Sequence, residues 1–415
     1  MRDLMTIARE AKTAKAAVAR LGADEKNRGL DAIAKTLEKN TREILAANAI
    51  DIENGRANGL NEGLIDRLTL TETRIADIAE GCRQVAALPD PVGELLWQKT
   101  RPNGLKIGLK RVPMGVIGII YEARPNVTVD AAALCFKAGS ACILRGGKEA
   151  FHSSLCLTQL MRSALAKEEL PENAINLLED TDRETANAMM RLNGYLDVLI
   201  PRGGAGLIQA VVKNATVPVI ETGTGNCHVY VDASADLTMA TQILLNAKCQ
   251  RISVCNAAES LLVHKDVAEK FLPLAAEALA PNHVKLHGCE RTRKILGENV
   301  ILATEEDYAQ EYLDYEMSVK IVDSLEEAIS HINTYNTGHS ECIVTESYTN
   351  SQRFLDEVDA AAVYVNASTR FTDGFVFGFG AEIGISTQKL HARGPMGLEA
   401  LTSQKYIIYG NGQIR

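Results

Sequence analysis

Residues 115–150, GVIGIIYEARPNVTVDAAALCFKAGSACILRGGKEA, decide the fold class of this chain. They open on a short apolar run, pass through a helical stretch over 126–138, and return to a second apolar run, ACIL at 141–144. Such an order of elements is typical of a βαβ unit with parallel strands. The alternation continues through AINLL, LDVLI and VPVI, with helical stretches at 148–167, 182–191 and 204–213. Residues 115–227 are therefore predicted to form a doubly wound α/β domain.

A second series of apolar runs begins at His228, with the members HVYV, ESLLV, SVKIV, ECIVT and AAVYV. This series predicts a second doubly wound α/β domain over 228–368. Residues 1–106 are predicted to form a helical lead-in and part of the first domain, because apolar residues recur at helical spacing in them. Residues 369–400 are expected to return and pack on the first domain.

Two segments fit neither series: LKIGLKRVPMG before the first strand and QKYIIYGNG near the end of the sequence. Both have the character of strands outside the main sheets. Residues 107–114 are predicted to pair with 401–415 in a small β arm of the kind that joins subunits. A homo-oligomer, either a dimer or a tetramer, is expected for this reason.

The bulk composition limits the class of protein. A chain of 415 residues exceeds what one hydrophobic core usually supports, so two or three packed units are expected. The net charge is −9, and no run of Lys and Arg is long enough to neutralise a series of phosphates. Nucleic acid is therefore an unsuitable partner. The longest apolar stretch, Val112 to Tyr121, is about half of the ~20 residues that a membrane span requires, so no membrane association is expected.

The N-terminal sequence and the cysteines indicate a cytoplasmic location. The opening MRDLMTIAREAKTAKAAVARLG mixes acids with bases and lacks a continuous apolar core, so it resembles neither a secretory signal nor a transit peptide. Nine cysteines without a CxxC pair predict reduced thiols. The nearest approach to a metal cluster, His283, His287 and Cys289, lacks a matching second half, and no metal is expected.

Two glycine-containing turns each follow a predicted strand and precede a helix: RGGKEA at 145–150 and PRGGAG at 201–206. Such turns expose backbone N–H groups and a helix N-terminus to a phosphate. Neither turn is the GxGxxG fingerprint, and a Gly-Gly turn of this kind is common. Because the turns lie at successive strand ends, and Arg145 and Lys148 flank one of them, we predict an anionic dinucleotide at this edge of the sheet.

The segment NAKCQRISVCNAAESLLVH places Cys249 on a predicted helix and Cys255 in the loop before a strand. Loops between rigid elements commonly carry catalytic groups. Small alanines after Cys255 would let a substrate approach, although a buried, inert thiol is the commoner state of either cysteine.

Two further side chains are candidates. Glu221, in ETGTGNC, follows an apolar run and precedes glycines, so it is a candidate acid or base, or a solvated or capping carboxylate. Asn126, in YEARPNVTVD, is either a helix N-cap or an amide donor to a developing oxyanion.

The order PMGVIGII, a basic glycine turn, a Gly-Gly turn, ETGTG and QRISVCNA resembles the aldehyde dehydrogenase superfamily across nearly the whole chain. Six blocks are similar, more closely, to the gamma-glutamyl phosphate reductase family: YEARPNVT, LRGGKEA, ETGTGNCH, CQRISVCNA, NASTRFTDG and HARGPMGLEALTSQKY. The resemblance implies an aldehyde dehydrogenase-like fold and the second reaction of proline biosynthesis. The substrate would be the acyl phosphate L-glutamyl 5-phosphate, and glutamate 5-kinase, which makes it, is a candidate partner.

The resemblance also implies residue roles. Cys255 would be the nucleophile that forms a thioester, and Asn126 would hold the oxyanion together with the N–H of Cys255. Glu221 matches the general-base position of the superfamily, but a thioester that is reduced rather than hydrolysed has less need of a base. For the amino-acid end of the substrate, Arg124 and Arg370 are candidates from charge and position, and either could equally be a surface residue.

Two departures from the superfamily bear on the cofactor. Where a glutamate normally binds the ribose hydroxyls, three positions after a basic residue, this chain has Lys148 after Arg145. A lysine attracts a 2′-phosphate that a carboxylate would repel, so NADPH is expected rather than NADH. The Glu-x-Phe-Gly-Pro motif is absent, and either Glu311 or Asp314 is a candidate for the nicotinamide ribose.

Two alternative functions remain compatible with the sequence. One is an acylating aldehyde dehydrogenase that acts on another acyl phosphate or on a thioester and keeps Cys255. A requirement for phosphate in the assay would separate the acyl phosphate reductase from this alternative. The other is a catalytically silent dinucleotide-binding relative, which the retention of Cys255, Asn126 and both glycine turns disfavours.

Overall fold

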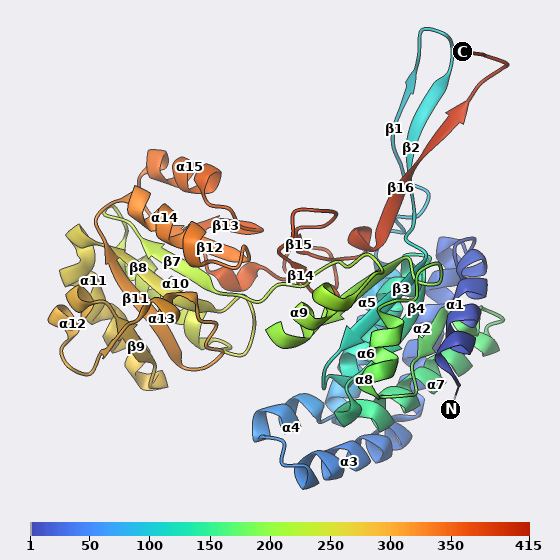
Figure 1. Ribbon diagram of the computed structural model, residues 1–415, viewed down its shortest axis with the longest axis horizontal. Coiled ribbons are helices and arrows are strands. Elements are labelled where there is room, and N and C mark those ends of the chain that lie inside the picture. The colour runs from blue at the N-terminus through green and yellow to red at the C-terminus, as the bar shows by residue number, and fades with distance from the viewer. Residues whose placement is uncertain (1) are drawn as a thin grey trace. The chain divides into compact units, whose positions relative to one another are not determined.

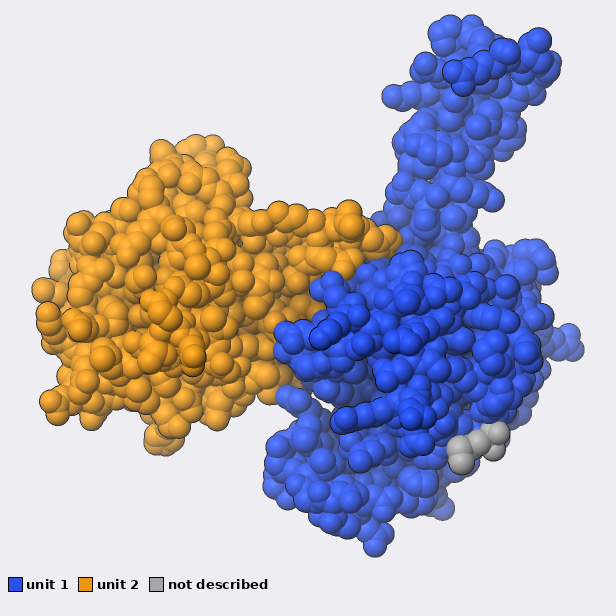
Figure 2. All heavy atoms as spheres, viewed as in Figure 1, with its two compact units in different colours: residues 1–221, 378–384, 396–415 blue, residues 222–377, 385–395 orange. Residues whose placement is uncertain are grey.

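The computed structural model describes residues 2–415 and divides into two compact units (Figure 1; Figure 2). Unit 1 comprises residues up to Glu221 together with 378–384 and 396–415, and unit 2 comprises 222–377 and 385–395. The predicted fold class is confirmed, because each unit is built on a wholly parallel sheet with helices packed on it. No helix within residues 2–415 combines the length and the apolar character of a membrane span.

The helical lead-in forms five helices of unit 1. Their apolar faces are buried, and Leu30, Ile33 and Leu37 of one helix are fully enclosed. Asp3, Asn61 and Thr71 begin three of them by accepting a hydrogen bond from a backbone N–H of the first turn. The bounds are α1 Leu4–Val18, α2 Ala23–Lys39, α3 Thr41–Ala57, α4 Glu62–Leu68 and α5 Glu72–Ala87.

The sheet of unit 1 has four parallel strands in the order β5-β4-β3-β6. Every residue of β3 is buried, as expected for a central strand covered on both faces. Helix α1 packs on one face through Ile7, Ala8 and Ala11. The strands are β3 Val116–Tyr121, β4 Ala141–Arg145, β5 Ile175–Leu177 and β6 Val198–Arg202, and the helices are α6 Pro125–Lys137, η1 Lys148–Ala150, α7 Phe151–Lys167, η2 Glu172–Ala174, α8 Arg183–Met189 and α9 Ala205–Asn214.

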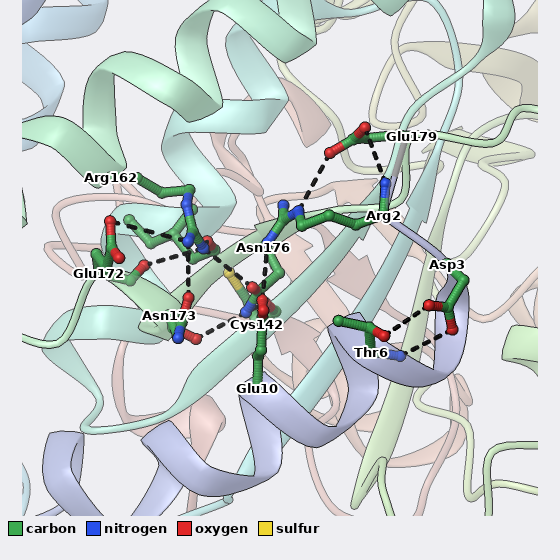
Figure 3. Close-up of polar contacts among 11 residues, drawn as sticks. Arg2, Asp3, Thr6, Glu10, Cys142, Arg162, Glu172, Asn173, Asn176 and Glu179 are labelled. Atoms are coloured by element: carbon green, nitrogen blue, oxygen red, sulfur yellow. Dashed lines mark hydrogen bonds and ion pairs between the residues drawn. The ribbon is translucent and has the colours of Figure 1, made fainter.

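Polar side chains hold the short edge strand β5 in place (Figure 3). The guanidinium of Arg162 donates to the Ile175 carbonyl at 3.0 Å and to Asn176 Oδ1 at 3.1 Å. The Asn176 amide in turn donates to the Cys142 carbonyl of β4 at 3.3 Å. Beside this group, Arg2 bonds Glu179, and so ties the start of the chain to the segment that follows β5.

A three-stranded antiparallel ribbon, β1-β2-β16, projects from the body of unit 1 (Figure 1). Its strands are β1 Leu95–Thr100, β2 Lys106–Pro113 and β16 Thr402–Tyr409. The two segments that fitted neither series pair with each other, from Lys106 with Tyr409 to Pro113 with Thr402. Strand β1 was not part of the predicted arm, because its sequence LLWQKT was assigned to the helical region. Its side chains are mostly exposed, so they lack the alternation of buried and exposed residues that indicates a strand.

Unit 2 contains seven parallel strands in the order β10-β9-β11-β8-β7-β12-β13. Alternate residues of β7 enter opposite cores: Val229 packs with α10 and α11, and Tyr230 packs with α14 and α15. The strands are β7 Cys227–Val231, β8 Ala258–His264, β9 Lys285–Gly288, β10 Ile301–Leu302, β11 Glu316–Val322, β12 Ser340–Val344 and β13 Ala362–Val365. The helices are α10 Leu237–Cys249, α11 Lys265–Leu279, η3 Ala280–Asn282, α12 Glu290–Leu296, α13 Glu305–Ala309, α14 Leu325–Tyr335, α15 Tyr348–Glu357 and η4 Thr369–Phe371.

The strand expected at 217–220, VPVI, does not form. Only Val219 makes a bridge to Leu199 of β6, and two backbone hydrogen bonds flank it. Pro218 has no N–H to donate, so a ladder cannot continue through it. The sheet of unit 1 therefore ends at β6.

The unit boundaries also differ from those expected. Unit 2 begins at Thr222 rather than at 228, because Gly223 N donates to the Ile385 carbonyl at 2.8 Å and Asn226 Nδ2 donates to the Tyr308 carbonyl at 2.7 Å, both within unit 2. Residues 369–400 are divided between the units rather than packed on the first. A short antiparallel pair, β14 Ile385–Ser386 with β15 Gly394–Pro395, keeps 385–395 with unit 2, and η5 Glu399–Leu401 lies in unit 1.

Candidate active site

Three turns meet at the carboxyl edge of the sheet in unit 1, where β3, β4 and β6 are neighbours. In two of them a carboxylate lies close over a glycine. A Cβ at Gly147 would meet the Glu149 carboxylate and lie 3.4 Å from the Ala123 nitrogen, and a Cβ at Gly203 would lie 2.7 Å from the Glu122 carboxyl carbon. Because parallel strands bring their carboxyl ends to one edge, both sequence-predicted glycine turns lie beside the turn after β3.

The turn after β4 does not present a vacant helix N-terminus. Asp51, buried on α3, accepts from His152 N at 3.1 Å, from Ser153 N at 2.8 Å and from Ser153 Oγ at 2.6 Å. These donors lie in the first turn of α7, so a carboxylate of the chain already neutralises its positive end. An anion bound here would therefore interact with side chains of the turn rather than with α7.

Two basic side chains of this turn are placed differently. Arg145 is half-buried: its Nη2 donates to the Thr181 carbonyl at 2.7 Å, while its Nε is buried without a hydrogen-bond partner. Burial lowers the pKa of Arg145, and the carboxylates of Glu149 and Asp180 oppose that shift. Lys148 is exposed. An unsatisfied guanidinium nitrogen beside an exposed lysine fits the phosphate of a dinucleotide.

The turn after β6 carries Gly203 and Gly204 and leads into α9. Its Gly204 N–H donates to Glu122 Oε2 at 3.0 Å. Glu122 is exposed and directly follows β3. A carboxylate therefore lies at the N–H group that this turn would offer to a phosphate.

Asn126 is the second residue of α6 rather than its N-cap. Arg124 is the N-cap and Pro125 takes the first helical position, where the missing N–H of proline has no consequence. The exposed Asn126 side chain donates through Nδ2 to Asp130 Oδ2 at 3.1 Å, one helical turn further on. The capping alternative is wrong, and the amide lies at the same sheet edge as the glycine turns.

In unit 2, Cys255 lies in a tight turn between α10 and β8. The adjacent Asn256 is buried and fixes that turn: its Nδ2 donates to the Thr372 carbonyl at 2.9 Å, and its carbonyl accepts from Thr369 Oγ1 at 2.7 Å. Cys255 itself is half-buried. Cys249, the other cysteine of the segment, is the last residue of α10, and burial raises the pKa of its thiol.

The loop 222–226 passes directly over the Cys255 turn. A Cβ at Gly225 would overlap the Cys255 carbonyl oxygen, so only glycine permits the approach. Cys227 Sγ donates to the same carbonyl at 3.2 Å. Glu221, which precedes this loop, is half-buried and is the last residue of the main segment of unit 1.

Arg370 is brought to the cysteine turn by η4. Its Nε donates to Gln250 Oε1 at 3.1 Å. Burial lowers the pKa of Arg370, the charge of Arg251 lowers it further, and the charge of Cys255 opposes both. Arg370 therefore lies within electrostatic range of Cys255, and a nearby cation stabilises a thiolate.

The two acids proposed for the nicotinamide ribose differ in their surroundings. Glu311 Oε1 accepts a hydrogen bond from Gly225 N at 2.6 Å, next to the Cys255 turn. Asp314 is exposed, and its carboxylate accepts from the neighbouring Tyr315 N at 2.7 Å. Glu259 of β8 holds the same segment through Leu313 N at 3.1 Å.

Glu259 is also fully buried against Lys248, with 2.5 Å between Oε2 and Nζ. Burial raises the pKa of Glu259 to about 7, and Lys248 opposes the shift.

Comparison with known proteins decides the family. The model of the aldehyde dehydrogenase family matches residues 2–291 and 317–407. The gamma-glutamyl phosphate reductase of Carboxydothermus hydrogenoformans is 61% identical over 415 residues, 100% of both chains, and that of Clostridium novyi is 65% identical over 390 residues, 94% of this chain and 93% of its own. The crystal structure of the Thermotoga maritima gamma-glutamyl phosphate reductase is 49% identical, covers 100% of both chains and has a TM-score of 0.98. The chain belongs to the gamma-glutamyl phosphate reductases of the aldehyde dehydrogenase family.

Membership in the aldehyde dehydrogenase family makes this chain an oxidoreductase with a nicotinamide dinucleotide as cofactor. The resemblance predicted from the sequence blocks is confirmed at the level of the family. Within residues 2–415, no group of three His, Cys, Asp or Glu side chains is arranged to hold a metal ion. The two ring nitrogens of His287 each contact a carboxylate: Nδ1 lies 3.0 Å from Asp307 Oδ1, and Nε2 lies 3.0 Å from Glu316 Oε2.

Sequence analysis missed three carboxylates at the sheet edge where it predicted the dinucleotide. They are Glu122 at the α9 turn, Glu149 folded over Gly147, and Asp130 beneath Asn126. One available signal was their position, within five residues of a strand end or of a predicted site residue. Glu122 and Glu149 lie against turns that fold onto them, so position alone does not distinguish them from solvated carboxylates. The i,i+4 spacing of Asp130 from Asn126 on a predicted helix was a signal that could have found their contact.

Proposed function

We propose that this enzyme reduces L-glutamyl 5-phosphate to L-glutamate 5-semialdehyde and phosphate with NADPH, through a thioester on Cys255. This is the second step of proline biosynthesis. The observation that carries the proposal is the identity of 61% over the full length of a gamma-glutamyl phosphate reductase. The Cys255 turn, which Asn256 fixes and whose thiol lies within electrostatic range of Arg370, supports it.

The chemistry assigned to the chain begins with the thiolate of Cys255. It attacks the γ-carbonyl, the C–O bond to phosphate breaks, and phosphate leaves with the electron pair. A nicotinamide cofactor, when bound, would supply the hydride that reduces the resulting thioester. Asn126 and the Cys255 N–H hold the oxyanion that forms on the carbonyl oxygen. As the C–S bond breaks, the aldehyde is released and the thiolate is restored, so Glu221 is not needed as a hydrolytic base.

Further residues are assigned to binding. Arg145, Gly146, Gly147 and Lys148 are assigned to the adenosine phosphate, and Gly203 and Gly204 to the pyrophosphate, which would displace the Glu122 carboxylate from the Gly204 N–H. Of the two acids in unit 2, Glu311 is assigned to the nicotinamide ribose, because it lies at the loop over Cys255. Arg370 is assigned to the anionic substrate beside the thiol, and Arg124, the N-cap of α6, to its amino-acid end.

The test is reduction of NADP⁺ by glutamate 5-semialdehyde, the reverse reaction, with and without phosphate. We expect wild-type activity to require phosphate and Cys255→Ala to lose at least about 10³-fold in kcat, as expected for a removed covalent nucleophile. Cys249→Ala is the matched control, because that cysteine belongs to the same segment but ends a helix, and it should keep its activity. Phosphate-independent activity would instead identify another acylating aldehyde dehydrogenase, and inactive wild type would contradict the proposal.

A further inference from the structure

The side chain of Asn126 donates a hydrogen bond to the carboxylate of Asp130. The two residues are four apart on α6, which puts them on one face of the helix. Side chains on a helix point toward its N-terminus, so the Asp130 carboxylate reaches back to the Asn126 amide. The donor is Asn126 Nδ2 and the acceptor is Asp130 Oδ2, at 3.1 Å.

An ionised carboxylate has no proton to donate, so it accepts only from the amino end of an amide. The bond therefore decides which way the Asn126 amide faces. One Nδ2 hydrogen is engaged by Asp130, and the other is left for a second acceptor. Without this partner, the amide can rotate and present its oxygen to a developing oxyanion, which would repel it.

The surroundings of Asp130 make it a fixed rather than a mobile partner. The side chain is half-buried, and α5 lies next to it: a Cβ added at Gly81 would be 3.9 Å from Asp130 Oδ1. Burial raises the pKa of Asp130 to about 6, while the hydrogen bond from Asn126 and the charge of Arg202, at the end of β6, lower it. The other titratable group that faces it is Cys82 of α5, whose own thiol pKa is raised, mainly by burial and partly by the charge of Asp130.

We propose that Asp130 is a positioning residue, which orients the Asn126 amide so that Nδ2 faces the oxyanion of the reaction. The inference rests on the proposed function, in which Asn126 is the oxyanion donor. Asp130 does not touch substrate or cofactor in this role. It acts only through Asn126, so a change at Asp130 should have no further effect on kcat once the Asn126 amide has been removed.

The test is a double-mutant cycle on kcat in the phosphate-dependent assay. We expect Asn126→Ala to lose about 10²-fold, the usual effect of one oxyanion donor. Asp130→Ala should lose about tenfold, with the KM for the semialdehyde and the Kd for NADPH within twofold of wild type. In the double variant, the loss should equal that of Asn126→Ala alone, because Asp130 has nothing left to orient.

A pH series separates orientation from general structural damage and also serves if Asp130→Ala does not fold. Asp130→Asn keeps an acceptor oxygen but does not titrate, so it should retain more activity than Asp130→Ala. The ratio of wild-type kcat to Asp130→Asn kcat cancels the titration of Cys255. We expect this ratio to be highest above pH 7 and to fall toward 1 below pH 5, because protonation of Asp130 removes its fixed direction.

The outcomes separate this inference from the proposed function. Losses that multiply in the double variant, or a kcat ratio that does not change with pH, overturn the role of Asp130 while leaving the thioester chemistry intact. Full activity of Asn126→Ala overturns the oxyanion role and the inference with it. Inactive wild type overturns the proposed function itself.

Discussion

At the scale of single residues, cofactor choice depends on the charges of the turn after β4. Lys148 is exposed, and the neighbouring Glu149 folds its carboxylate over Gly147. A 2′-phosphate carries about two negative charges at neutral pH, so reversing the charge at 148 should weaken NADPH much more than NADH. We expect Lys148→Glu to lower kcat/KM for NADPH about 100-fold and to change that for NADH less than threefold.

Steady-state kinetics with both cofactors measures this preference directly. Lys167→Glu is the matched control, since it reverses the charge of a lysine at the far end of the same α7 region and should leave both values unchanged. Equal losses with NADPH and NADH would show that Lys148 contacts a part common to both cofactors, and would contradict its assignment to the 2′-phosphate.

The residues that sequence analysis identified share one property: each is distinctive in its local sequence. Cys255 follows QRISV, and Lys148 interrupts a known motif. Glu122 was missed because its partner, the Gly204 N–H, is brought to it only by folding, whereas Asp130 pairs with Asn126 within one helix, at a spacing that the sequence already contains. A carboxylate has many solvated positions in any sequence, and the few that orient another side chain look the same until the partner is seen.

At the scale of elements, α7 depends on α3 for its first turn. Asp51 of α3 accepts three hydrogen bonds from the start of α7, and all of the groups involved are largely enclosed. Removing the carboxylate leaves two backbone N–H groups without a partner and the Ser153 hydroxyl without its acceptor, although Asn48 Nδ2 still donates to that oxygen, at a cost of about 3 kcal/mol. We expect Asp51→Ala to lower the Tm by about 5–10 °C, following the usual scaling for a unit of this size.

Calorimetry of the whole chain measures that change, and Asp51→Asn, which keeps an acceptor oxygen, should recover about half of it. Asp66→Ala on α4 is the control, because its ion pair with Arg74 is exposed and such pairs contribute about 0–1 kcal/mol. A Tm for Asp51→Ala equal to that of the control would show that water replaces the cap and that α7 does not need α3.

Strands were predicted well where they are long and apolar, and poorly elsewhere. All five runs of the second series became strands of unit 2, but β9 and β10 were missed. β9, Lys285–Gly288, is mixed in polarity and β10 has two residues, so neither carries a periodic signal of its own. Strand β9 forms by pairing with the edge of β11, and β10 forms by pairing with β9. These pairings depend on the tertiary structure and not on the local sequence.

At the scale of the whole molecule, the arm is the part that a monomer does not explain. Strand β16 pairs with β2 on one side and is the edge of its sheet on the other. Tyr406 is 65% exposed, Ile408 61% and Tyr409 60%. Large apolar side chains on an uncovered edge strand favour association, and a second copy of this chain is the expected partner.

The mass in solution tests that expectation. By size-exclusion chromatography with light scattering, the wild type should have twice or four times the 45.0 kDa of one chain. Tyr406→Asp combined with Ile408→Asp places two charges on the edge strand, and we expect the mass to fall toward that of one chain. Leu302→Asp is the control, because Leu302 is 47% exposed on β10, outside the arm. A variant that keeps the wild-type mass would assign the contact to another surface, and a monomeric wild type would leave the exposed strand as a feature of the single chain.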